Sequence, residues 1–299
     1  HMANARGKSI DNTHLSIDQA EKRGFIHRDY IAHCLRWTHV CKFMLQKGRY
    51  KTATVLDVGC GKDIPLIRMM NTSRMSPKEY YGIEYNKSPS EMALKHFENT
   101  TFKPELYFDI DFVERVEVHK KFLEINGTKK SLPSVITCFE VIEHVEPAHA
   151  RAMVDRMANI AAASERAGQE CNVFISTPNW DPQVGAADNH VNEMKHDAIG
   201  ALLESVNFKV VEVYGTFASQ KDLKPVLSDE EKALFGCLGE YYDSNYLATI
   251  FAPLYPAQSR NCLWHLRIRD EVEDRGMIFP EMQEVEEPWT SSEKWQELA

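Results

Sequence analysis

The chain has 299 residues, a formal net charge of −9 and 43% hydrophobic residues, which allows one large domain with additions or two small ones. It contains no apolar run near the roughly 18 residues that a membrane-spanning helix needs, and no signal-peptide pattern near its start. We therefore expect no membrane partner. The seven cysteines form no C-x-x-C pair, so we also expect reduced thiols and a cytoplasmic location.

Charge is distributed unevenly along the chain. Residues 1–51 contain ten Lys and Arg against four Asp and Glu, whereas residues 270–299 contain two against ten. A basic lead segment could meet phosphate groups, but the acidic whole disfavours broad nonspecific binding to nucleic acid. Two solvated ends of opposite sign are the simpler explanation.

Helices and strands alternate in the hydrophobic pattern. In chain order, the pattern predicts a helix over 16–47, a strand over 53–61, a helix over 62–70, a strand over 80–86, a helix over 88–98, strands over 104–112 and 133–139, a helix over 147–163, a strand over 171–179, a helix over 196–208, and strands over 209–217 and 261–269. The Asn126-Gly127 pair predicts a hairpin turn. The alternation is typical of an α/β fold with a doubly wound, mostly parallel sheet.

This pattern divides the chain into four expected parts. They are a helical N-terminal segment (1–52), a core (53–217 and 261–269), a helical cap insertion (218–260) and an acidic, irregular tail (270–299). The cap is rich in aromatic residues and ends with Arg260, a composition that suits a flat ring, a base or a sugar. Burial of the cap against the sheet explains the same aromatics. The basic stretch 22–30, with Arg36, His39 and Lys42, could neutralise phosphates or fold over a cofactor as a lid.

A glycine-containing turn follows the first strand. Asp57, Gly59 and Gly61 lie in the run DVGCG, and glycine at such a turn lets a ligand approach the backbone closely. The third glycine of a dinucleotide fingerprint is absent, which disfavours a nicotinamide dehydrogenase. A carboxylate at the end of this strand also suits a cationic ligand better than a pyrophosphate.

The next two strands also end in acids. Glu84 ends the second strand, where a carboxylate can accept both hydroxyls of a ribose. Asp109 and Asp111 end the third, where an acid could accept the exocyclic amine of adenine. Because ligands bind at the carboxyl ends of parallel strands, these acids predict a shared nucleoside site.

Together, VLDVGCG, YYGIEYN, the acidic third strand and CFEVIEHV resemble the class I S-adenosylmethionine-dependent methyltransferases. The resemblance covers roughly residues 53–217 and 261–269, and it implies a Rossmann-like, seven-stranded sheet with an antiparallel last strand. It also implies S-adenosyl-L-methionine as cofactor. The cofactor residues carried over are Asp57, Gly59 and Gly61 around the methionine part, Glu84 at the ribose, Asp111 with the Phe112 backbone at the adenine, and the carbonyls near Cys138 at the ammonium. Asp63 departs from the family, which often has a third glycine there.

An E-x-x-E-H run follows the fourth strand. Glu140, Glu143 and His144 can converge on one side of a helical turn, and this donor set suits Mg²⁺, Mn²⁺ or Zn²⁺. A long polar loop over 176–194 supplies His190. The spacing is similar to that of small-RNA 3′-terminal 2′-O-methyltransferases and quinone-biosynthesis O-methyltransferases. That similarity implies a divalent ion, Mg²⁺ or Mn²⁺, held by these four residues, which chelates two adjacent hydroxyls of the acceptor.

Other interpretations remain open. Many methyltransferases with no known metal carry E-x-x-E-H or a close variant, in which the acid caps a helix and the histidine packs near the cofactor. Without a metal, His144 or His190 could also act as a general base. The acceptor would be a nucleotide, an RNA end or a small hydroxylated molecule, with Asn189, Asn192 and Glu193 as candidate contacts. Methylation of an amine is less favoured, because the sequence reads TPNW instead of D/N-P-P-Y/F. A cofactor-binding but inactive partner protein is a further alternative, and the oligomeric state is not predicted.

Overall fold

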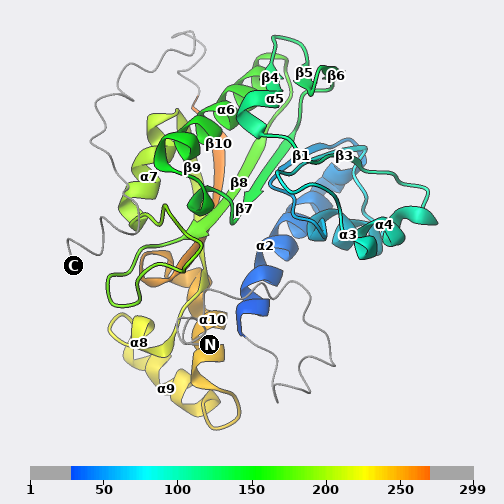
Figure 1. Ribbon diagram of the computed structural model, residues 1–299. Coiled ribbons are helices and arrows are strands. Elements are labelled where there is room, and N and C mark those ends of the chain that lie inside the picture. Colours follow the sequence, from blue (N-terminus) through cyan, green and yellow to red (C-terminus); the bar gives the residue numbers. More distant parts are fainter. Residues whose placement is uncertain (1–27, 270–299) are drawn as a thin grey trace.

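The computed structural model describes residues 28–269, so the predicted tail over 270–299 and the predicted helical residues before 28 lie outside the described residues. At its centre is a seven-stranded sheet in the order β3-β2-β1-β7-β8-β10-β9 (Figure 1). The strands are β1 (Thr54–Val58), β2 (Glu79–Ile83), β3 (Glu105–Tyr107), β7 (Val135–Phe139), β8 (Asn172–Pro178), β9 (Phe208–Phe217) and β10 (Asn261–Ile268). β10 pairs antiparallel with both β8 and β9, whereas the other pairings between these seven strands are parallel. The predicted α/β fold and its antiparallel last strand are confirmed.

Helices cover both faces of the sheet (Figure 1). One face packs against α2 (Arg28–Leu45), α3 (Pro65–Thr72) and α4 (Glu91–Glu98), and the other against α5 (Phe112–Arg115), α6 (Pro147–Arg166) and α7 (His196–Ser205). Successive residues of a strand point to opposite faces of the sheet. Val55 therefore belongs to the apolar cluster on the face covered by α2, α3 and α4, and Leu56 to the cluster on the face covered by α5, α6 and α7. A 3₁₀ turn, η2 (Gln46–Lys51), joins α2 to β1, and η3 (Ile142–His144) follows β7.

A second, three-stranded sheet interrupts the chain between β3 and β7. It consists of β4 (Val116–Val118), β5 (Leu123–Ile125) and β6 (Thr128–Lys130). Asn126 and Gly127, at φ values of 49° and 80°, join β5 to β6, which confirms the predicted hairpin turn. The small sheet itself was not predicted from the polar sequence around the turn.

The predicted strand over 104–112 is too long. It ends at Tyr107, and Asp111 is the N-cap of α5, where its Oδ1 accepts hydrogen bonds from the backbone N–H groups of Val113 and Glu114. A capping carboxylate satisfies amides that the first helical turn leaves without a partner. Asp111 therefore starts a helix instead of ending a strand.

The cap lies between β9 and β10 in sequence and at the carboxyl ends of the parallel strands in space (Figure 1). It contains α8 (Gln220–Leu223), α9 (Asp229–Leu238), α10 (Ser244–Phe251), η4 (Ala252–Leu254) and η5 (Pro256–Gln258). Phe251 and Tyr255 pack on the cap's own apolar cluster. Tyr241 and Tyr242 are exposed. Arg260 donates to the Asp222 carboxylate over 2.8 Å, which gives it a structural partner within the cap.

Two sequence expectations concern location. Among the helices of residues 28–269, none has both the length and the apolar character that a bilayer span needs. All seven cysteines lie in this range and none is in a disulfide bond in the structure.

Candidate active site

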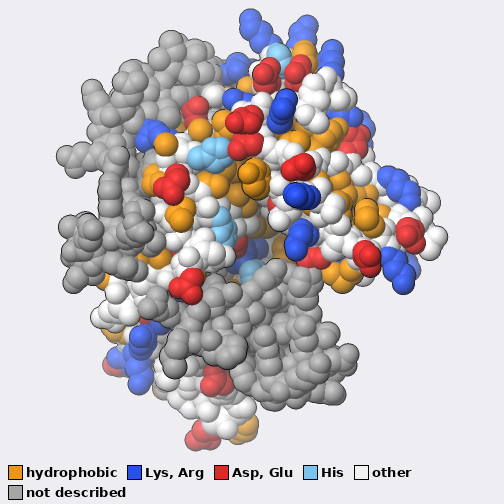
Figure 2. Space-filling model, in the orientation of Figure 1, with side chains coloured by type: hydrophobic (Ala, Val, Ile, Leu, Met, Phe, Trp, Pro, Cys, Tyr) orange, Lys and Arg blue, Asp and Glu red, His pale blue; other side chains and the backbone are white. Residues whose placement is uncertain are grey.

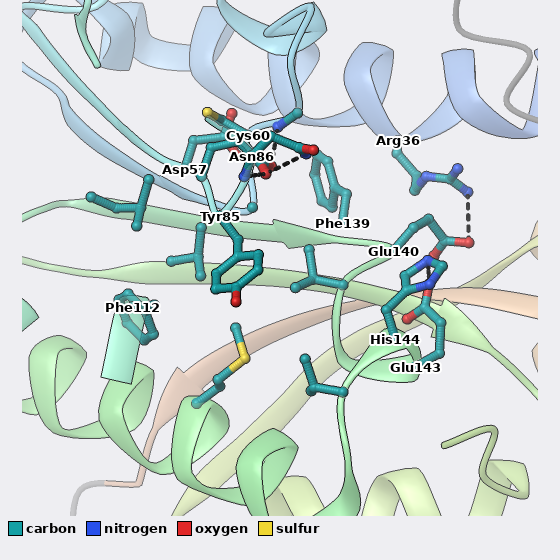
Figure 3. Close-up of a pocket in the computed structure, with 18 of the residues that line it drawn as sticks. Arg36, Asp57, Cys60, Tyr85, Asn86, Phe112, Phe139, Glu140, Glu143 and His144 are labelled. Atoms are coloured by element: carbon teal, nitrogen blue, oxygen red, sulfur yellow. Dashed lines mark hydrogen bonds and ion pairs between the residues drawn. The ribbon is translucent and has the colours of Figure 1, made fainter. Parts of the chain in front are cut away.

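One cavity of about 940 Å³ opens at the carboxyl ends of β1, β2 and β7, under α2 (Figure 3). In Figure 2, histidine, acidic and basic side chains surround the hollow on this face of the molecule. Its volume is at the upper end of the range for cofactor pockets, roughly 300–1,000 Å³. It therefore has room for a cofactor and part of an acceptor.

The glycine turn after β1 forms one wall of the cavity. Gly59 has a φ of 70°, and its N–H donates to the Ile83 carbonyl over 2.8 Å. A Cβ atom on Gly59 would lie 2.2 Å from Cγ2 of Val141, so both the backbone conformation and the neighbour exclude a side chain. Gly61 also has a positive φ, of 79°.

Asp57 lies within β1, and its carboxylate faces the cavity from a buried position. It accepts hydrogen bonds from the Tyr80 hydroxyl (2.6 Å) and the Thr137 hydroxyl (2.8 Å). Burial raises the pKa of Asp57 to about 6, although both hydrogen bonds lower it, and nearby Glu84 raises it further. A cationic ligand group would favour the ionised form.

Glu84 follows β2 and is held in place by backbone amides. Its Oε1 accepts from the Gly61 N–H (2.9 Å), and its Oε2 accepts from the backbone N–H (2.8 Å) and side-chain amide (2.7 Å) of Asn86. Tyr85, next in the chain, is 78% exposed and its ring points into the cavity (Figure 3). Sequence analysis missed Tyr85. An aromatic residue directly after a strand-ending acid was the available signal.

The predicted adenine residues line the same cavity. Phe112 is buried at the start of α5. The Asp111 Oδ2 lies 3.3 Å from Nε2 of His149 on α6, while its Oδ1 caps α5. Cys138 is fully buried within β7, and the neighbouring Phe139 lines the cavity. The structure thus brings the predicted cofactor residues of β1, β2 and the β3–α5 loop to one cavity.

Three of the four predicted metal ligands come together at the other end of the cavity. One ligand atom each from Glu143, His144 and His190 lies within 4.8 Å of the other two, and the two imidazole centroids are 4.6 Å apart. Glu143 is fully buried, and its Oε2 accepts from the Thr177 hydroxyl over 3.0 Å. Within residues 28–269, its Oε1 has no hydrogen-bond partner and lies 3.8 Å from Nε2 of His144.

Electrostatics at Glu143 favour a cation. Burial, followed by the carboxylate of Glu140, raises the pKa of Glu143 well above its ordinary value. The group would therefore be neutral unless a positive charge balanced it. A divalent ion would supply that charge and use the oxygen that has no hydrogen-bond partner.

The hydrogen bonds of both histidines turn the same ring nitrogen toward this group. The His144 Nδ1 lies 3.1 Å from the Asn189 carbonyl, and the His190 Nδ1 lies 2.8 Å from the Glu193 carboxylate. Each Nδ1–H donates to its oxygen, which assigns the lone pair to Nε2. Such partners orient histidine ligands in metal sites, so one carboxylate and two imidazoles fit a divalent ion here.

The described structure does not bring Glu140 into the group of three. Its Oε2 accepts from the Ser176 hydroxyl (2.9 Å) and its Oε1 from the Asn261 side-chain amide (2.5 Å), while the Arg36 guanidinium lies 4.0 Å away (Figure 3). Burial raises the pKa of Glu140, but Arg36, His33 and the two hydrogen bonds together hold it below its ordinary value. Glu140 is thus ionised and already paired.

The remaining candidates divide between cavity and core. Asn189 lines the cavity, whereas Asn192 and Glu193 are fully buried. Arg36 lines the cavity too but is 2% exposed and is paired with Glu140. His39 packs against the Tyr214 ring at 4.7 Å. Arg36 and His39, both on α2, thus have structural partners, and the roles predicted for the basic segment, phosphate binding or a lid over the cofactor, stay predictions.

Comparisons with known proteins give one family match. The family described as "Methyltransferase domain" matches residues 27–213. Among solved structures, a magnesium protoporphyrin IX methyltransferase from Synechocystis PCC 6803 is 12% identical, with 90% of this chain and 94% of that chain covered and a TM-score of 0.49. A 1,6-didemethyltoxoflavin-N1-methyltransferase from Burkholderia thailandensis is 11% identical, with 78% of this chain and 79% of that chain covered and a TM-score of 0.46. No curated protein matches the chain.

Proposed function

The chain belongs to the methyltransferase domain family and is an S-adenosylmethionine-dependent methyltransferase, and we propose that it methylates a hydroxyl oxygen of an acceptor that carries two adjacent hydroxyls, with the help of Mg²⁺ or Mn²⁺. The observation that carries this proposal is the Oε1 atom of Glu143. It is buried, has no hydrogen-bond partner within residues 28–269, and lies beside two imidazoles. Leaving such an oxygen uncompensated is costly.

Glu143, His144 and His190 would hold the ion. When bound, a divalent cation lowers the pKa of an alcohol and fixes its orientation, which is the chemistry that an unactivated hydroxyl lacks. Mn²⁺ accepts imidazole ligands more readily than Mg²⁺, which prefers oxygen. Mn²⁺ is therefore the better probe of this group.

The opposite end of the cavity would hold the cofactor. Glu84 is assigned to the ribose hydroxyls, Asp111 and the Phe112 backbone to the adenine, and Asp57 with the glycine turn to the methionine part. The carbonyls near Cys138 would accept from the ammonium. Two observations support this assignment. The cavity is lined by Asp57, Glu84, Asp111 and Phe112. The pKa of Asp57 is about 6, so a nearby cation would favour its ionised form.

Aromatic side chains support a ring-bearing acceptor. Trp37, Phe139 and Phe217 line the cavity together with the metal-ligand candidates. Aromatic walls with a few polar groups suit a flat ring or base. Both a small aromatic diol and the ribose of a nucleotide or RNA end meet these requirements.

A methyl-transfer assay with paired acceptors tests the proposal. Labelled cofactor would be incubated with 1,2- and 1,3-dihydroxybenzene, and with ribonucleosides and their 2′-deoxy counterparts. We expect label on the adjacent diols alone, lost with a chelator and restored by Mn²⁺. Equal labelling of the non-adjacent diols, or labelling that a chelator does not reduce, would contradict it.

Metal-free transfer to oxygen or nitrogen is the second candidate. Burial, followed by neighbouring His190, lowers the pKa of His144, so its imidazole is neutral near pH 7 and could accept a proton. Transfer that persists in chelator but is abolished by His144→Gln would favour this candidate.

A further inference from the structure

The two carboxylates of the E-x-x-E-H run have different surroundings. Glu140 directly follows β7 with a φ of 57°, and donors from three separate elements surround its carboxylate. They are the hydroxyl of Ser176 on β8, the amide of Asn261 on β10 and the guanidinium of Arg36 on α2. Glu143, three residues later, keeps one oxygen without a hydrogen-bond partner in the described residues.

Coordination of a cation by Glu140 would compete with these contacts, above all with the ion pair to Arg36. Both of its oxygens already accept hydrogen bonds, and Arg36, 2% exposed, would lose the carboxylate that balances its charge. Removing the partner of a buried charge is strongly destabilising. Glu143 has no such cost, because the oxygen turned toward His144 accepts no hydrogen bond from residues 28–269.

We infer that Glu140 is not a ligand of the proposed metal centre but a positioning residue that fixes α2 against the acceptor end of the cavity. This inference rests on the proposed metal-assisted function. The centre would then have three protein ligands, Glu143, His144 and His190, and it would keep more open positions than a four-ligand centre.

The contacts of Glu140 reach the walls of the cavity. Arg36 lies on α2, which also supplies Ala32, His33 and Trp37 to the cavity lining. On the other side, the Oδ1 of Asn261 accepts from the Thr216 hydroxyl of β9 over 2.9 Å. Glu140 thus joins the loop that carries Glu143 and His144 to α2, through Arg36, and to β8 and β10, through Ser176 and Asn261.

Two isosteric variants of the full chain separate the roles. Glu140→Gln keeps the size and the hydrogen bond from Asn261, and its amide nitrogen can donate to the Ser176 hydroxyl, but it loses the charge that pairs with Arg36. Glu143→Gln is the matched change at the proposed ligand. Mn²⁺ would be titrated by calorimetry into each metal-free protein, and hydrogen exchange of the α2 amides would be followed by mass spectrometry. Arg36→Met removes the positive charge of the same ion pair and is the second variant that tests the anchoring of α2.

We expect Glu140→Gln to bind Mn²⁺ within about threefold of the native protein and Glu143→Gln to lose about 100-fold or more. Exchange of the α2 amides should rise by about tenfold in Glu140→Gln and in Arg36→Met, and stay native in Glu143→Gln. Equal loss of Mn²⁺ binding in both glutamine variants would overturn the inference. So would unchanged α2 exchange in Glu140→Gln and Arg36→Met. Absence of Mn²⁺ binding in the native protein would instead overturn the proposed metal-assisted function, since the exchange data report on Glu140 independently.

Discussion

The Nδ1 atom of His190 lies 2.8 Å from Oε2 of Glu193, and both side chains are buried. The same carboxylate oxygen accepts the backbone N–H of Ala187 over 3.0 Å. The ring of His190 is therefore oriented by an anion within its own loop, with Nδ1–H as the donor. A carboxylate in this position fixes the tautomer and the ring orientation of a histidine ligand.

Glu193→Gln should weaken Mn²⁺ binding by about tenfold to 100-fold. Glutamine can accept the same hydrogen bond, so the loss would report the missing charge and not a missing contact. Calorimetric titration of the metal-free variant measures it. Glu240→Gln, at an exposed position of the cap, is the control and should bind like the native protein. Native affinity in Glu193→Gln would show that its charge does not act on His190.

Gly59→Ala should destabilise the fold and remove cofactor binding. The new Cβ would lie 2.2 Å from Val141 at a φ of 70°, so we expect a loss of about 3 kcal/mol or more in the free energy of unfolding. Gly127→Ala, at a φ of 80° with nothing within 4 Å of the new Cβ, is the matched control and should cost about 1 kcal/mol. Urea unfolding compares the two, and equal losses would show that the Val141 contact is unimportant.

Asp57 should make cofactor binding depend on pH. Its folded pKa is about 6 because of burial, and an ammonium group in the ligand favours the ionised form. Below that pH the carboxyl must lose a proton on binding, so the affinity for S-adenosylhomocysteine should fall by up to about tenfold per pH unit. In Asp57→Asn, binding should be weaker and flat between about pH 5 and about pH 8. An equally steep profile in the variant would exclude Asp57 as its origin.

His265 should lower stability in mild acid. Burial, and then His39, Arg267 and Arg49, lower its pKa from 6.5 to about 4, and its Nε2 pairs with the Asn172 side-chain oxygen at 2.8 Å. The unfolded chain binds a proton at higher pH than the folded chain, so stability is present above about pH 6.5 and is lost as pH falls toward about 4. The native melting temperature should drop by about 3 °C more than that of His265→Gln between about pH 7 and about pH 5. Parallel curves would contradict this.

Local patterns in the sequence predicted most of the helices, strands and turns of the fold. Val55 and Leu56 face opposite layers, as a buried strand between two helix layers requires, and the Asn126-Gly127 pair turns as its positive φ preference predicts. The sequence predicts Asp111 at a strand end because an acid after an apolar run has the same pattern at a strand end and at a helix N-cap. Only the amides of Val113 and Glu114 distinguish the two.

The site was less predictable than the fold, because the residues that contact its side chains are distant in sequence. The spacing of Glu143, His144 and His190 was visible in the sequence. The contacts that occupy Glu140 come from Arg36 and Asn261, and no local pattern links these positions to it. Which acids of a motif are already paired is therefore a tertiary property.

The most direct test of the account is a calorimetric titration of Mn²⁺ into the metal-free full chain with S-adenosylhomocysteine present, alongside a His190→Ala variant. We predict one site with a dissociation constant of about 1 μM in the native protein, or about −8 kcal/mol, and no measurable binding in the variant. Absence of binding in the native protein, or equal binding in both, would contradict a metal centre at Glu143, His144 and His190.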